Sequence, residues 1–195
     1  MDKLTEQYYE KNAESYVKET VKADMHEVCD RFLSFVKDGG KILDLGCGSG
    51  RDSLYFKKRG YVVTAMDGSQ SICKLAEKLL QQPVVCKDFM SLCDEEVYDG
   101  IWACASLLHC HRDEVSLVMH KIYVALKKNG VAYVSFKYGD FAGYRNGRYY
   151  FDMHEEMLDA LIKEVPGFIK EEIWISGDVQ KRKEKWLNAL LRKEG

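Results

Sequence analysis

Short apolar segments alternate with longer amphipathic segments over residues 41–136 of the chain. The apolar runs are typical of parallel strands covered on both faces, which carry few polar positions. They predict strands at Ile42–Leu45, Tyr61–Met66, Pro83–Cys86, Asp99–Ala105 and Val131–Phe136. The amphipathic segments between them predict helices at Arg51–Arg59, Ser69–Leu80 and Asp113–Lys127. This alternation indicates an α/β fold with a doubly wound, parallel sheet and right-handed crossovers.

The two ends of the chain add further elements. Apolar positions at helical spacing predict N-terminal helices at Leu4–Lys18 and Val21–Val36. After the fifth strand comes a long connection, Lys137–Asp152, and then a helix at about His154–Glu164. No helix separates the last two strand-like runs, so we expect an antiparallel hairpin at the sheet edge, formed by Phe168–Ser176 and Lys185–Leu191.

A glycine-rich segment, Gly46-Cys47-Gly48-Ser49-Gly50, follows the first strand of the predicted sheet. Glycines at alternate positions allow positive φ and bring backbone amides close to a ligand. The helix that begins at Arg51 presents its N-terminus to negative charge at the same place. The next strand leads into Asp67, whose carboxylate can accept two hydrogen bonds from a ribose diol. This combination predicts a site for a nucleotide-type cofactor.

The spacing of the glycines separates two cofactor classes. Dinucleotide-binding folds favour G-x-G-x-x-G, whereas this loop has G-x-G-x-G with Asp44 two residues before the first glycine. A carboxylate there suits a cofactor whose nearby end carries an ammonium group, and it disfavours a pyrophosphate. The segment Asp44–Gly50 resembles motif I of the class I S-adenosylmethionine-dependent methyltransferases. Asp67 and the pair Asp88-Phe89, after the third strand, fit the same family.

The resemblance covers nearly the whole chain and implies a single methyltransferase domain over residues 1–195. Its sheet is expected to be mostly parallel and seven-stranded, in the order 3-2-1-4-5-7-6, with one antiparallel edge-side strand and N-terminal helices. Residues 1–38 would form these helices and a cofactor lid, or only an amphipathic helix packed on the domain. Residues 39–137 would form the cofactor-binding core, and residues 138–195 the acceptor loop, a helix and the terminal hairpin. Arg51-Asp52-Ser53 looks like the branch with tellurite-resistance and thiopurine-type enzymes, which suggests a small-molecule acceptor.

The resemblance also implies which residues hold S-adenosyl-L-methionine and its product S-adenosyl-L-homocysteine. The glycine loop would contact the methionine part, and Asp67 would hold the ribose. Asp88 would accept a hydrogen bond from the adenine amine, and Phe89 would pack on the adenine ring. Alternatively, Asp88 is a turn residue and Phe89 belongs to the core. Asp52 would either cap its helix or face the cofactor amine. The expected cofactor contacts are Tyr16, Asp44, Gly46, Cys47, Gly48, Arg51, Asp67, Gly68, Ser69, Asp88, Phe89, Ala103 and Cys104.

His109 is the candidate catalytic residue, because it follows the fourth strand, at the edge where open α/β sheets place their reacting groups. Histidine titrates near neutral pH, so His109 could act as a general base or orient the acceptor. The alternative is a histidine that caps a loop or fills space. The adjacent Cys110 and His111, with Cys104 nearby, do not have the spacing of a zinc site, so we expect no metal.

The connection after the fifth strand is the expected acceptor site, because it is dense in cations and phenols beside the cofactor. Arginine recognises carboxylate or phosphate through two parallel hydrogen bonds, so we expect a small acidic or phosphorylated acceptor. The alternative is a solvated loop in which Asp140 and Asp152 neutralise the arginines. The expected acceptor contacts are Tyr8, His109, Lys137, Tyr138, Arg145, Arg148 and Tyr149.

The composition of the chain indicates which classes of binding partner to expect. The formal net charge of −2 gives no global basic field, and the chain lacks the Pro-Pro motif of enzymes that grip a flipped base. A nucleic-acid or tRNA acceptor is therefore not favoured, although it stays open. No apolar run has the length of a membrane span, and seven cysteines, an odd number, favour reduced thiols in the cytoplasm. We expect a monomer or a homodimer. Two other functions remain alternatives at this point: a non-catalytic S-adenosylmethionine-binding protein and an NAD-linked oxidoreductase.

Overall fold

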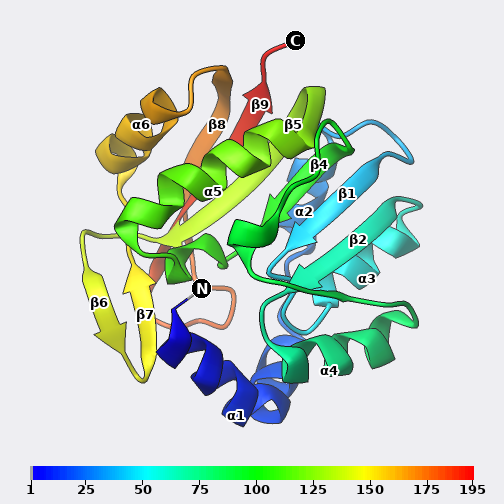
Figure 1. Cartoon of the computed structure of the whole chain (residues 1–195), viewed down its shortest axis with the longest axis vertical. Helices are drawn as coiled ribbons and strands as arrows, with labels where there is room; N and C mark the ends of the chain where they lie inside the picture. Colours follow the sequence, from blue (N-terminus) through cyan, green and yellow to red (C-terminus); the bar gives the residue numbers. More distant parts are fainter. Residues whose placement is uncertain (1) are drawn as a thin grey trace.

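The computed structural model describes residues 2–195 and confirms the predicted α/β sheet (Figure 1). Seven strands form one sheet in the order β3-β2-β1-β4-β5-β9-β8. This is the predicted order, because a hairpin that was not predicted takes the numbers β6 and β7. β1 to β5 run parallel, and β9 is antiparallel to both β5 and β8. The strands of the sheet are β1 (Lys41–Leu45), β2 (Val62–Asp67), β3 (Val85–Cys86), β4 (Tyr98–Ala103), β5 (Leu126–Lys137), β8 (Phe168–Gly177) and β9 (Lys185–Lys193).

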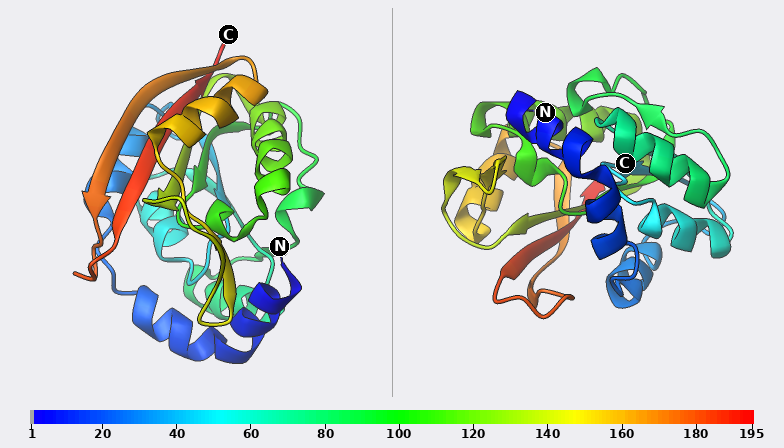
Figure 2. Two further views of the ribbon diagram at one scale, coloured as in Figure 1. Left: turned by 90° about the vertical axis from the view of Figure 1, so that its left-hand side faces the viewer. Right: turned by 90° about the horizontal axis from the view of Figure 1, so that it is seen from below.

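Helices cover both faces of this sheet (Figures 1 and 2). One face carries α2 (His26–Leu33), α3 (Arg51–Lys58) and α4 (Gln70–Leu80). The other carries α5 (Arg112–Ala125) and α6 (Glu155–Glu164). Two short 3-10 turns, η1 (Phe89–Ser91) and η2 (Leu107–His109), precede and follow β4. The layers therefore agree with a doubly wound fold.

The central strand β4 shows how the core fixes the sheet. Successive side chains of a strand point to opposite faces. Ile101 accordingly joins the cluster under α5 and α6, while Trp102 packs against Phe32 and Phe56 under α2 and α3. Trp102 also stacks on Tyr133 of β5, with ring centroids 4.1 Å apart. These buried rings hold the strands whose carboxyl ends carry the site.

The N-terminal helix α1 (Lys3–Thr20) lies across the carboxyl edge of the sheet, next to α4 and β7 (Figure 2). The side chain of Asp2 caps the first turn of α1, and the helix covers the predicted range Leu4–Lys18. Among the helices formed by residues 2–195, none combines the length and the apolar character needed to cross a membrane.

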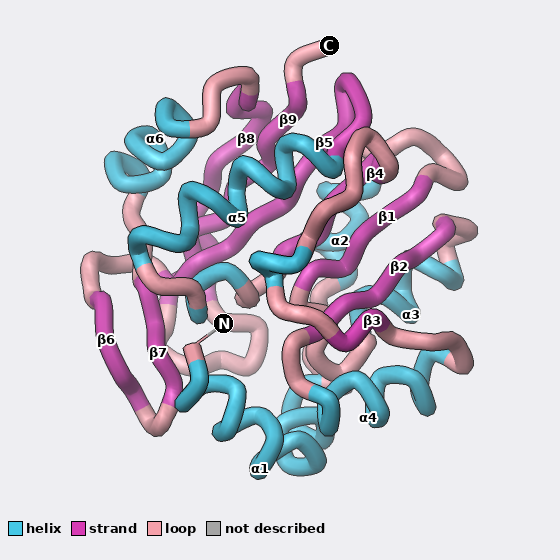
Figure 3. Tube along the Cα trace, viewed as in Figure 1, coloured by secondary structure: helices cyan, strands magenta, loops and turns pink. Residues whose placement is uncertain are grey.

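The segment predicted as a long connection, Lys137–Asp152, contains a hairpin that lies apart from the main sheet (Figure 3). Its strands are β6 (Ala142–Arg145) and β7 (Arg148–Phe151), which pair antiparallel. The turn residues Asn146 and Gly147 have φ of +49° and +78°, as in the tight turns that join hairpin strands. The segment does connect β5 to α6, as predicted, but the hairpin inside it was not predicted.

Other predicted bounds also need correction. α2 begins at His26 instead of Val21, because α1 continues to Thr20 and the amide of Val21 completes its last turn. α5 ends at Ala125, since Leu126 already pairs with Tyr98, and the pairing then shifts register within β5. β3 is reduced to two residues, Val85–Cys86.

Candidate cofactor and acceptor site

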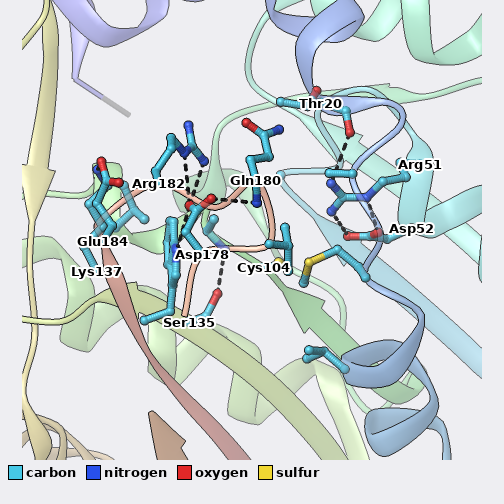
Figure 4. Close-up of a pocket in the computed structure, with 18 of the residues that line it drawn as sticks. Thr20, Arg51, Asp52, Cys104, Ser135, Lys137, Asp178, Gln180, Arg182 and Glu184 are labelled. Atoms are coloured by element: carbon cyan, nitrogen blue, oxygen red, sulfur yellow. Dashed lines mark hydrogen bonds and ion pairs between the residues drawn. The ribbon is translucent and has the colours of Figure 1, made fainter. Parts of the chain in front are cut away.

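A cavity of about 610 Å³ lies at the carboxyl edge of the sheet, where Tyr9, Tyr16 and Thr20 of α1 line it. One wall comes from the glycine loop and the end of β4. The opposite wall comes from the hairpin β6–β7 and the connection between β8 and β9 (Figure 4). Open α/β sheets bind their ligands at this edge. The expected cofactor half and the expected acceptor half therefore meet in one cavity.

The glycine loop has no room for a side chain at its first position. Gly46 has φ of +83°, and a Cβ atom there would lie 2.5 Å from Cβ of Ser106. The amide of Gly46 donates to the carbonyl oxygen of Met66 at 2.8 Å, and the amide of Gly48 donates to Oδ2 of Asp67 at 3.0 Å. The loop is thus held against β2, and its amides at Gly46, Cys47, Gly48 and Gly50 bond within the protein.

Two buried acids, Asp44 and Asp52, lie beside the loop, and Arg51 pairs with Asp52. The guanidinium of Arg51 donates to both carboxylate oxygens of Asp52, at 2.7 and 2.8 Å, and the indole of Trp102 adds a bond of 3.0 Å. Asp52 therefore pairs with Arg51 and does not cap α3. Burial, together with the charge of Asp52, raises the pKa of Asp44, which accepts a bond from Ser53 at 2.6 Å. An ammonium group bound beside Asp44 would favour the ionised form of this carboxyl group, so the wall suits a ligand with an ammonium group.

Asp67 and Phe89 border a second, narrow cavity of about 30 Å³. Tyr9 and Tyr16 line it too, and it has room for only one or two water molecules. A purine enters this space only if α1 or these two rings move. Oγ of Ser106, buried at the same place, has no hydrogen-bond partner within residues 2–195, so a ligand can satisfy it. The carboxylate, the ring and the orphan hydroxyl together fit a nucleoside.

Several expected site residues lie outside both cavities. Ser69 accepts a bond from the amide of Ile72 and caps α4. Oδ1 of Asp88 accepts a bond from the amide of Met90, which is the turn role; its contact with adenine stays a prediction. The expected residues that do not line either cavity are Tyr8, Gly48, Ser69, Asp88, Ala103, Tyr138 and Tyr149. Those that do are Tyr16, Asp44, Gly46, Cys47, Arg51, Asp67, Gly68, Phe89, Cys104, His109, Lys137, Arg145 and Arg148.

Helix α1 is fastened to both walls of the site. Glu10 accepts bonds from the hydroxyls of Ser69 and Ser71 at the start of α4, at 2.7 and 2.6 Å. On the other side, Oγ1 of Thr5 accepts a bond from the amide of Tyr149 in β7 at 2.8 Å. This bridge agrees with the hypothesis that α1 acts as a lid.

Replacing Glu10 by glutamine is expected to loosen α1 over the cavity. The variant loses charge-assisted bonds, and a loss of about 1 kcal/mol speeds local opening roughly fivefold. Hydrogen exchange of the α1 amides measures this effect. The exposed Glu14, on the same helix, supplies the control Glu14→Gln. If both variants exchanged at the wild-type rate, Glu10 would not fasten the helix.

His109 is buried in η2 and lines both cavities. Its Nδ1 lies 2.7 Å from the carbonyl oxygen of Tyr149, and its Nε2 lies 2.9 Å from the hydroxyl of Tyr9. Burial, with smaller contributions from the cations Arg148 and Lys137, lowers the pKa of His109 to about 4. The expectation that this histidine titrates near neutral pH does not hold here, and the imidazole is neutral at pH 7.

Most cations that line the large cavity are already paired with carboxylates. Arg145 donates to both oxygens of Asp152, at 3.1 and 2.7 Å, so the predicted alternative of a neutralised arginine applies to it. The other pairs are Arg51 with Asp52, Lys137 with Glu184, and Arg182 with Asp178. Arg148 is the exception among the described residues: its guanidinium contacts rings instead of a carboxylate.

The sequence analysis missed the connection between β8 and β9 as part of the site. Figure 4 shows Asp178 between Gln180 and Arg182, facing the cavity opposite Arg51. A topological signal was available, because β8 and β5 are both antiparallel to β9 and therefore end at the same edge. Tyr9 was also missed, since helical periodicity does not say which ring of α1 enters the cavity.

Comparison with known proteins points to methyltransferases. Residues 42–130 match a family model described as a methyltransferase domain. The chain is 32% identical over 98 residues to an uncharacterized methyltransferase of Schizosaccharomyces pombe. That match covers 48% of the chain and 35% of the other protein, so the chain spans only about a third of that curated relative.

Solved structures with low sequence identity share the fold. A 1,6-didemethyltoxoflavin-N1-methyltransferase of Burkholderia thailandensis, with bound S-adenosylhomocysteine, gives a TM-score of 0.81 at 22% identity, over 98% of this chain and 88% of that one. The magnesium protoporphyrin IX methyltransferase of Synechocystis PCC 6803, with bound S-adenosylmethionine, gives 0.74 at 16% identity, over 100% and 98%.

The family match over residues 42–130 marks this part of the chain as a methyltransferase domain, and the strand order and the glycine loop support a class I S-adenosylmethionine-dependent methyltransferase. The methyltransferase domain implies S-adenosylmethionine as the cofactor, and the two solved structures hold S-adenosylhomocysteine or S-adenosylmethionine.

Proposed function

We propose that the chain transfers a methyl group to a small acceptor that carries an acidic group, and that Arg148 binds this group. S-adenosylmethionine supplies a methyl group on a sulfonium; the methyl carbon bonds to the acceptor's nucleophilic atom while the old bonding pair stays on sulfur. The chain's task is then to hold the acceptor in line and exclude water. Asp44, the glycine loop and Asp67 would hold the cofactor at one wall, opposite Arg148.

The observation that carries this proposal is the state of Arg148. Its guanidinium lies 4.5 Å from the ring centre of Tyr8 and 5.3 Å from that of Tyr150. Nη1 makes one long bond, 3.4 Å, to the hydroxyl of Tyr9, and the buried Nε has no partner among the described residues. A guanidinium has five donors, so most remain available to a carboxylate or a phosphate.

The walls around Arg148 favour a small and planar acceptor. Rings of Tyr9, Tyr150 and Trp186 line the cavity, and α1 lies over it. Aromatic walls and a few placed polar groups fix the orientation of a small ligand. The similar enzyme from Burkholderia thailandensis, whose structure holds bound 1,6-didemethyltoxoflavin, is compatible with an acceptor of this size.

An Arg148→Gln variant is expected to raise KM for acidic acceptors about ten- to hundredfold, because a hydrogen bond to a charged group is worth about 1.5–3 kcal/mol. The assay follows S-adenosylhomocysteine release with hydroxybenzoates, mercaptobenzoates and aryl phosphates. S-adenosylhomocysteine affinity should not change. Arg59→Gln is the matched control, since Arg59 is exposed and pairs with Asp30 outside both cavities. Equal turnover of the acids and their neutral amides would contradict the proposal.

A further inference from the structure

Tyr9 is a side chain of α1 that lines both cavities and contacts His109 and Arg148. Its ring lines both cavities, between the narrow one beside Asp67 and the large one beside Arg148. Its hydroxyl lies 2.9 Å from Nε2 of His109 and 3.4 Å from Nη1 of Arg148. The ring also packs edge-on against Tyr16, with centroids 5.0 Å apart. Tyr9 is thus fixed in direction by a base, a cation and a neighbouring ring.

The bonds of His109 decide which way the proton of Tyr9 points. A carbonyl oxygen only accepts, so Nδ1 of His109 carries the proton of the 2.7 Å bond to Tyr149. The neutral imidazole then has its lone pair on Nε2, and the hydroxyl of Tyr9 donates to it. The lone pairs of the Tyr9 oxygen consequently face Arg148 and the cavity.

From this geometry we infer that Tyr9 is a catalytic residue that receives the acceptor's proton, and that His109 is the positioning residue behind it. The inference rests on the proposed transfer to a small acceptor. The acceptor's O–H, N–H or S–H proton moves to Oη of Tyr9 while the proton of Tyr9 moves to Nε2 of His109. Because burial and the nearby cations lower the pKa of His109, this transfer requires that the acceptor's anionic group neutralise Arg148 and that the sulfonium lose its charge in the same step. The resulting imidazolium is held by the carbonyl of Tyr149, and its proton passes to water after turnover.

This arrangement makes the reacting groups depend on the position of α1. His109 follows β4, whereas Tyr9 is carried by α1 and is held there by Thr5 and Glu10. The relay is therefore complete only while α1 is docked. A docked lid also excludes water, so both requirements of methyl transfer are met together.

The first test measures the relay without an acceptor. Nitrogen-15 NMR of His109, in the complex with S-adenosylhomocysteine, should show a proton on Nδ1 and a hydrogen-bonded Nε2. Tyr9→Phe should shift the Nε2 resonance, whereas Tyr55→Phe should not, since Tyr55 bonds to Asp30 outside both cavities. A proton on Nε2, or an Nε2 signal that ignores Tyr9→Phe, overturns the inference.

The second test compares turnover with a hydroxybenzoate and a mercaptobenzoate. Tyr9→Phe should lower kcat for the hydroxybenzoate about hundredfold, in the range of general acid–base catalysis, with KM and S-adenosylhomocysteine affinity within about threefold. The more acidic thiol should lose less, because it needs less help to ionise. His109→Gln should cause a similar loss, and the double variant no greater one, because the two residues act as a unit. Wild-type kcat in Tyr9→Phe, or losses that multiply, overturn the inference.

The two proposals fail in different ways. An unchanged KM in Arg148→Gln would contradict the proposal of an acidic acceptor and would not affect the inference of the Tyr9–His109 hydrogen bond. An unchanged His109 spectrum in Tyr9→Phe would contradict the relay and would not affect the proposal that Arg148 binds the acceptor's acidic group.

Discussion

A Gly46→Ala variant is expected to bind S-adenosylhomocysteine about ten- to hundredfold more weakly than the wild type, because overpacking costs typically 1–3 kcal/mol. The added Cβ would lie 2.5 Å from Cβ of Ser106 and 3.4 Å from Cε1 of Phe89. To relieve this contact, the loop must move away from the narrow cavity in which the nucleoside is expected. The affinity is measured by isothermal titration calorimetry.

The control for this variant is Gly60→Ala. Gly60 also has a positive φ, +90°, but a Cβ there meets no atom within 4 Å. Its alanine variant should lose about 1 kcal/mol of unfolding free energy through backbone strain and keep its cofactor affinity. Equal affinities in the two alanine variants would show that the close approach at Gly46 does not shape the site.

An Asp67→Ala variant is expected to abolish measurable binding of S-adenosylhomocysteine and to lower the unfolding free energy by about 2 kcal/mol. The carboxylate accepts bonds from the amides of Gly48 and Ser69, each at 3.0 Å, and its removal leaves both donors without a partner. The ribose would lose its acceptor at the same time. Thermal unfolding and calorimetry measure the two effects.

Asp140→Ala is the matched control, because Asp140 is exposed in the connection before β6. It should change neither affinity nor stability beyond about 0.5 kcal/mol. Asp67→Asn keeps one acceptor oxygen, so it should retain more stability than Asp67→Ala. If Asp67→Ala bound S-adenosylhomocysteine like the wild type, the ribose contact proposed for this carboxylate would be wrong.

The sheet could be predicted from the sequence because each strand depends on local signals. The apolar runs and their helical spacers fix strands β1 to β5, and the absence of a helix between the last two runs fixes the terminal hairpin. The hairpin β6–β7 was missed although Asn146-Gly147 is a strong turn signal. The charges around it drew the interpretation toward a binding loop.

The candidate site could be predicted only in part, for a different reason. The glycine loop and Asp67 are recognisable because their roles depend on backbone geometry and on residues adjacent in sequence. Arg145 and Arg148, by contrast, look alike in sequence, yet one is neutralised by Asp152 and the other faces tyrosine rings. Similarly, the His109–Tyr9 bond joins residues that are 100 positions apart, so only tertiary packing sets it and the lowered pKa of His109.

The most direct test of the account is calorimetric titration of the wild-type chain with S-adenosylhomocysteine and, separately, with NAD. The carboxyl-rich wall at Asp44 and the closely packed glycine loop predict micromolar binding of S-adenosylhomocysteine and no binding of NAD. Binding of NAD without binding of S-adenosylhomocysteine would contradict the account.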